Sequence, residues 1–218
     1  MSSVVKYQDF EVLPQLEAMK LPREVLLDIF DIALGEWSNV NDDDPVETRL
    51  DEMRRWITRY LRADPRLRAL GWTKCKYGKI EGIKHDVLGL KVAAVNTDAR
   101  TGVISKKPSN VSEKGPQTKV LTEQNGAVAE PDMFGYVKGV CDNPVSRYDF
   151  WCFCTHVSDE SKSAEISRPI EIVAGYLRDF STRVILLAPG EYPGRRKPEL
   201  VPEDFAEIEQ PSISRRAA

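Results

Sequence analysis

Three arginines share one face of a predicted helix. Arg55, Arg59 and Arg62 are spaced by four and then three residues, and side chains at these spacings lie together on a helix surface. Guanidinium groups arranged in this way can bind successive phosphates or an acidic protein surface. Asp51 and Glu52 stand one turn earlier and can pair with Arg55, so a solvated helix face with internal ion pairs is the alternative.

A polar block over residues 96–118 contains the second group of candidate binding residues, which lie at a predicted strand end and around a predicted helix start. These residues are Asn96, Asp98, Thr101, Lys114 and Thr118. Such positions often bind ligands, because free backbone N–H groups at a helix N-terminus can hold an anion. The run KGPQT lacks the Gly-x4-Gly-Lys-Ser/Thr pattern of a Walker A loop. The alternative is a turn and a helix start selected only for backbone geometry.

A metal-dependent enzyme acting on nucleic acid or nucleotide is the first catalytic hypothesis. Such an enzyme needs carboxylates to hold Mg²⁺ and a lysine close to the reacting water. The candidate residues are Asp86, Asp98 and Lys91. Gly89 occupies the position where the usual motif carries its second acid, so this hypothesis needs another acid, such as Glu81, in an unusual geometry.

Cys152, Cys154 and His156 alternate along a predicted strand, and Cys141 precedes them. Thiolates and imidazoles bind zinc, but structural zinc sites favour closely spaced cysteines at turns, and alternate strand residues lie about 7 Å apart. Buried cysteines usually act as small apolar residues. We therefore expect no metal site here and no other cofactor. The chain also lacks a Gly-x-Ser-x-Gly elbow and a Gly-x-Gly-x-x-Gly fingerprint.

The charge is distributed unevenly along the chain. The net charge of the 218 residues is −3, but residues 71–119 carry ten basic and four acidic side chains. A basic segment on a mildly acidic chain indicates a local anion-binding surface or, alternatively, an ordinary solvated face.

The sequence predicts a cytoplasmic protein without a membrane partner. The N-terminus has no apolar segment of the signal-peptide type, and no run approaches the roughly 18 apolar residues of a membrane helix. The four cysteines are then expected to be reduced thiols.

The elements that must position these residues follow from the apolar periodicity. Helices are predicted over residues 21–35, 45–64, 66–70, 117–125 and 170–180. Strands are predicted over 87–95, 148–157, 163–167 and 183–188, with a returning strand beginning at Val103. Residues 1–20 fit an arm or a short helix.

The predicted fold is α+β, with N-terminal helices packed on a mixed sheet of four to six strands and a short crossover helix. The run 148–157 is apolar on both strand faces, which is typical of a central strand. Residues 163–188 are expected to form a strand–helix–strand crossover. The predicted divisions are a helical region over 1–70, a sheet domain over 71–190 and a proline-rich charged tail over 191–218.

The runs GWTKCKYGKIEG, VAAVNTDARTG and KGPQT, together with Asn125, resemble a block of uncharacterised bacterial proteins carried on phages, prophages and plasmids. The likeness covers residues 71–126, with AEISRP at 164–169. It implies a mobile-element setting and no particular chemistry.

These observations favour a non-enzymatic binding or adaptor protein of a phage or mobile element. Its expected target is a protein or a nucleic-acid-associated molecule. The metal-dependent enzyme is the first alternative. A structural or assembly protein that docks through the proline-rich tail is the second. The oligomeric state stays open.

Overall fold

The strand β5 (Asp149–Val157) lies in the middle of a seven-stranded sheet, as the apolar run over 148–157 predicts. The computed structural model describes residues 3–39, 46–128 and 148–192. Trp151 and Phe153 of β5 belong to one hydrophobic core, and Phe150 and Cys152 belong to a second core. The prediction of a central strand covered on both faces is therefore confirmed.

The sheet is mixed and follows the order β1-β7-β6-β5-β4-β3-β2. β4 runs parallel to β5 and β1 runs parallel to β7, whereas the other neighbouring pairs are antiparallel. The other strands are β1 (Val4–Lys6), β2 (Thr73–Tyr77), β3 (Ile80–His85), β4 (Leu90–Asn96), β6 (Lys162–Val173) and β7 (Tyr176–Leu187). The sheet thus has one strand more than the upper end of the predicted range.

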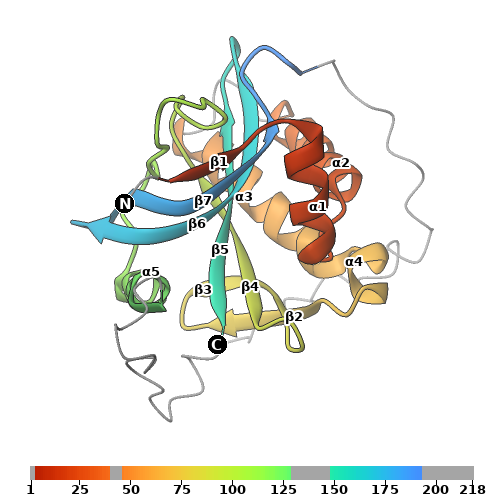
Figure 1. Cartoon of the computed structure of the whole chain (residues 1–218). Coiled ribbons are helices and arrows are strands. Elements are labelled where there is room, and N and C mark those ends of the chain that lie inside the picture. The colour runs from red at the N-terminus through yellow and green to blue at the C-terminus, as the bar shows by residue number, and fades with distance from the viewer. Residues whose placement is uncertain (1–2, 40–45, 129–147, 193–218) are drawn as a thin grey trace, which may run out of the picture.

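Helices cover both faces of the sheet, which confirms the α+β class (Figure 1). The helices are α1 (Asp9–Ala18), α2 (Arg23–Trp37), α3 (Val46–Ala63), α4 (Pro65–Ala69) and α5 (Pro116–Val128). The first three pack on the face that carries Trp151 and Phe153, and α5 contributes Leu121 to the other face. The predicted helices 21–35, 45–64, 66–70 and 117–125 correspond to α2, α3, α4 and α5.

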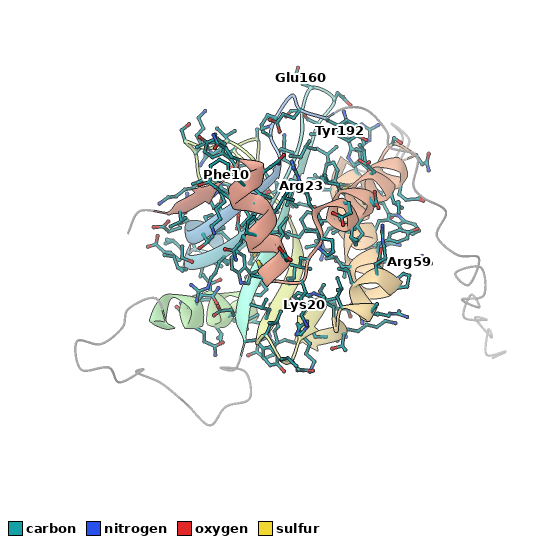
Figure 2. The ribbon with its side chains drawn as sticks, turned by 45° about the vertical axis from the view of Figure 1, so that its right-hand side comes forward. Phe10, Lys20, Arg23, Arg59, Glu160 and Tyr192 are labelled. Carbon is teal, nitrogen blue, oxygen red and sulfur yellow. The ribbon has the colours of Figure 1, made fainter. Side chains whose placement is uncertain are left out.

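The N-terminal region is built into the sheet. β1 pairs with the outer side of β7, and Arg23 at the start of α2 donates to the backbone oxygen of Leu186 at 2.8 Å. Arg23, labelled in Figure 2, also pairs with Asp9 at 2.6 Å. Within the described residues up to position 70, β1 therefore joins the sheet, and α1 to α4 share a core with the predicted sheet domain. The predicted tail lies outside the described residues from position 193 onward.

The predicted helix over 170–180 is wrong, because this segment forms the hairpin between β6 and β7. Ala174 and Gly175 form its turn with φ of 49° and 77°, which suits the right-handed twist of the flanking strands. The predicted strand–helix–strand crossover over 163–188 is wrong for the same reason. The crossover helix of this fold is α5, which lies between the parallel strands β4 and β5.

Two further segments differ from the predictions. No regular strand begins at Val103, because residues 101–106 form turns or bends or have no regular structure, and the loop pairs back only through an isolated bridge from Asn110 to Thr97, just after β4, within the described residues. The β2–β3 hairpin was not predicted, since its alternating lysine and apolar residues give a weak strand pattern.

Candidate anion-binding site

A cavity of about 640 Å³ lies where α3, the β2–β3 hairpin, β4 and the start of α5 come together. These elements can be followed in Figure 1. The basic side chains that line the cavity come from all of these elements except β4. They are Arg54, Arg55, Arg59, Arg62, Lys74, Lys79 and Lys114. Three acidic residues, Asp51, Glu81 and Glu113, also line the cavity, so basic groups outnumber acidic groups in its wall.

The cavity exists because β3 leaves β4 at Gly82. The pairing of the two strands ends with Ile83 opposite Val92. A Cβ atom added at Gly82 would lie 2.1 Å from the backbone oxygen of Val92, so the two backbones cross in close contact at this point. Beyond the crossing, the β2–β3 hairpin turns away, and among the described residues no strand pairs with residues 93–95 of β4 on that side.

The arginine stripe, which consists of Arg55, Arg59 and Arg62, lies on α3 next to the helix face that packs into the core. Met53, Ile57 and Leu61 are buried in the first core, so the adjoining helix face is directed to the cavity.

The predicted pair of Glu52 with Arg55 is present at 2.6 Å, whereas Asp51 pairs with Arg54 at 3.2 Å. Arg62 pairs outside the helix, with Glu81 of β3 at 2.7 Å, which was not predicted. The solvated-face alternative therefore describes part of the stripe correctly.

Two groups of the stripe lack a partner among the described residues: the Arg59 guanidinium has no carboxylate partner, and the Arg62 Nε atom has no hydrogen-bond partner. Arg59, labelled in Figure 2, lies over the ring of Trp56 at 4.8 Å. The Nε atom of Arg62 is buried. A buried donor without a partner is destabilising, but this atom is covered by protein, so the exposed Arg59 is the group of the stripe that is open to an anion.

Lys114 faces the stripe from the start of α5. Its backbone N–H donates to the oxygen of Gly175 at 2.9 Å, which fixes the residue against the β6–β7 turn. Within the described ranges its ammonium group forms no hydrogen bond or ion pair. Burial lowers the pKa of Lys114, and the nearby Arg54 lowers it further. A partly buried cation without an acidic partner is a group that an anionic ligand would stabilise.

Asn96 and Thr118 also line the cavity, as predicted candidates. The Nδ2 atom of Asn96 donates to the backbone oxygen of Leu50 at 2.6 Å, which holds α3 at the end of β4. Asn96 therefore positions the arginine stripe.

Asp98 and Thr101 lie outside this cavity and stabilise their own turn. The Oδ1 atom of Asp98 accepts from the backbone N–H groups of Arg100 and Ser109. Thr101 is fully buried, and its hydroxyl pairs with that of Thr97 at 2.6 Å. For these two residues the structure agrees with the alternative of backbone geometry.

Two of the three candidate catalytic residues, Asp86 and Lys91, lie close together at Tyr148, whereas Asp98 lies apart from them. Asp86 pairs with Lys84 at 2.8 Å and with the Tyr148 hydroxyl, before the start of β4. Lys91 lies 4.5 Å from the ring centre of Tyr148, and burial lowers its pKa. Asp98 follows the other end of β4, roughly 20 Å away along a seven-residue strand.

The side chains considered as zinc ligands do not form one group. Cys152 and Cys154 are buried in the second core, whereas the Nδ1 atom of His156 lies 3.2 Å from the backbone oxygen of Thr97. Cys141 lies outside the described residues. In the part of the chain that the structure describes, no three His, Cys, Asp or Glu side chains are grouped for a metal ion.

Several residues of the cavity were not among the predicted site residues. Arg54, Lys74 and Lys79 line it, although the positive charge of residues 71–119 already indicated the two lysines. Ala94 lines it as well, and no residue-type motif indicates a small apolar residue as part of a binding site.

Comparisons with family models, with curated proteins and with solved structures find no match for this chain. Of the helices described here, none combines the length and the apolar character that crossing a membrane requires.

Proposed function

We propose that this chain is a binding protein whose cavity holds a phosphate-bearing ligand of nucleotide or nucleic-acid chemistry. The observation that carries the proposal is the convergence of two predicted groups. The arginine stripe of α3 and Lys114, which are more than fifty residues apart in the sequence, line the same cavity. The phage or plasmid setting and the cytoplasmic location stay predictions.

The shape of the site favours a small ligand as the partner, rather than a flat acidic protein surface. Its volume of about 640 Å³ falls within the range of roughly 300–1,000 Å³ that is usual for small-molecule sites. Arginine forks and lysine ammonium groups are the side chains that proteins commonly use for phosphate. The cations approach from α3, the β2–β3 hairpin and α5, so they can surround a compact anion.

The two cations without a carboxylate partner give the sharpest test. Arg59→Ala and Lys114→Met each remove one positive charge without leaving an acidic partner unpaired. Lys106→Ala is the matched control, because Lys106 is exposed in the turn after Val103 and does not line the cavity.

Titration calorimetry with inorganic triphosphate at low ionic strength is the measurement. We expect each variant to weaken binding about tenfold and the Lys106 control to bind like the unmodified chain. We also expect the affinity to fall as salt is added, because ions screen exposed charges. Equal affinities in all four proteins, or no binding to the unmodified chain, would refute the proposal.

A further inference from the structure

The edge of β4 that faces the cavity has a gap one residue wide in its hydrogen bonding. Before the gap, Val92 pairs with Ile83 of β3. After the gap, the backbone oxygen of Asn96 accepts from the N–H group of Val111 at 3.1 Å. Between them lies Ala94, which the ladder leaves without a partner on this side.

The direction of the Ala94 backbone groups follows from its neighbours. Thr97 donates its N–H group to Thr155 of β5 at 2.8 Å, so odd-numbered residues at this end of β4 point their backbone groups toward β5. Backbone groups of successive residues in a strand alternate between the two edges. The N–H and C=O groups of Ala94 therefore point away from β5, toward the edge that β3 has left.

This gap suits a small planar group. An extended peptide that adds to a sheet needs several ladder positions, but Val92 and Asn96 are already paired. The remaining position offers one donor beside one acceptor from the same residue. A nucleobase edge presents a matching acceptor beside a donor.

The wall around Ala94 has two kinds of surface. Ile80, Ala93, Val95 and Phe150 give apolar contacts, and the cations of α3 and Lys114 line the rest. This combination suits a ligand with an apolar, planar end and an anionic end.

We infer that the cavity binds a nucleotide, with the base edge paired to the backbone N–H and C=O groups of Ala94 and the phosphates held by the arginine stripe and Lys114. This inference rests on the proposed function and specifies its ligand. All common bases carry a donor beside an acceptor, so the gap selects for a base without fixing which one.

The affinity test compares phosphate-bearing probes that carry a base with probes that carry none. The probes are ATP, CTP, GTP, UTP, ribose 5-phosphate and inorganic triphosphate, and a 5′-phosphorylated dinucleotide represents a nucleic-acid end. We expect at least one base-bearing probe to bind tenfold or more tightly than inorganic triphosphate. If a mononucleotide binds more tightly than the dinucleotide, the natural source of the base is a free nucleotide. If the dinucleotide binds more tightly, the source is the end of a nucleic acid.

The second readout is hydrogen exchange of single amides in ¹⁵N-alanine-labelled protein. The Ala94 amide should exchange rapidly in the free chain and become protected when a base-bearing probe binds, but not when inorganic triphosphate binds. The Ala93 amide is the internal control, because it points toward β5 and should be protected in every state.

Binding of inorganic triphosphate as tightly as any nucleotide, or an Ala94 amide that no nucleotide protects, would overturn the inference and leave the proposed function standing. If no probe binds, both fail.

Discussion

The guanidinium of Arg183 lies 2.6 Å from the carboxylate of Glu165, and both side chains are buried between β6 and β7. A second contact of 2.9 Å joins Arg183 Nε to the other carboxylate oxygen, so the pair is bidentate. The same two residues hold the loop after β4. Glu165 accepts from the backbone N–H of Gly102, and Arg183 donates to the backbone oxygens of Val103 and Lys106. This loop continues along the chain to Lys114, so the pair fixes the first part of the segment that carries Lys114.

Glu165→Gln is expected to destabilise the chain by about 3–5 kcal/mol, because it leaves the Arg183 charge buried without compensation. Urea denaturation measures the loss. Glu52→Gln is the matched control. Its pair with Arg55 is solvent-accessible at the arginine, which has 69% of its side chain exposed, and such pairs contribute about 0–1 kcal/mol. A further test is the double variant Glu165→Gln with Arg183→Met. It should lose less stability than the two single variants together, and additive losses would show that the residues act independently.

The lowered pKa of Lys114 predicts a distinctive pH dependence of anion binding. Only the charged ammonium attracts an anion, and burial makes Lys114 lose its proton below the ordinary lysine value of 10.5. Affinity for sulfate, which keeps its charge in alkaline solution, should therefore fall as the pH rises through the lowered pKa toward 10.5. The anion favours the charged form, so binding in this window should take up a proton.

Titration calorimetry of sulfate in buffers of different ionisation enthalpy, from about pH 7 to about pH 10, measures both effects. Lys114→Met should bind sulfate more weakly and with a flatter pH profile. The same slope in the unmodified chain and in Lys114→Met would contradict the prediction.

Gly82 is predicted to tolerate no side chain. The added methyl group of Gly82→Ala would meet the backbone oxygen of Val92 at 2.1 Å, and a backbone atom cannot move aside easily. We expect a loss of about 1–3 kcal/mol in the free energy of unfolding and a weaker affinity of the cavity for triphosphate. Gly115→Ala is the control for stability, since its added Cβ atom would lie 3.5 Å from the Gln117 side chain, an ordinary contact. Equal stability of the two variants would show that β3 does not cross β4 this closely.

Much of the fold was predictable because long amphipathic segments and one strand apolar on both faces carry strong local patterns. The run DFWCFCTHV predicts the central strand by itself, and Pro45 and Pro65 mark the ends of α3. The β2–β3 hairpin was missed because lysines alternate with few apolar residues on a strand pair at the sheet edge. Its stability comes from pairing with β4, which is a long-range contact.

The candidate site was predictable in its parts but not in its assembly. Spacing alone identifies Arg55, Arg59 and Arg62 as one helix face, and loop chemistry identifies Lys114. Their common cavity depends on Gly82 diverting β3 from β4, and Ala94 contributes through its backbone position. Neither property belongs to a residue type, so neither can be read from the sequence.

The turn of the β6–β7 hairpin gives a test of the largest error in the sequence interpretation. Ile170, Val173, Ala174 and Leu177 match a helical spacing by coincidence, whereas Ala174 has φ of 49° and Gly175 has φ of 77°. A residue with a Cβ atom is disfavoured in this left-handed region, and Asn and Gly tolerate it better. Ala174→Asn and Ala174→Gly should therefore each raise the free energy of unfolding, by up to about 1 kcal/mol, as urea denaturation would measure. In a helix the same changes would lower stability, since Asn and Gly are weaker helix formers than Ala. The sign of the change thus distinguishes the hairpin from the helix, and a loss of stability in both variants would contradict the hairpin.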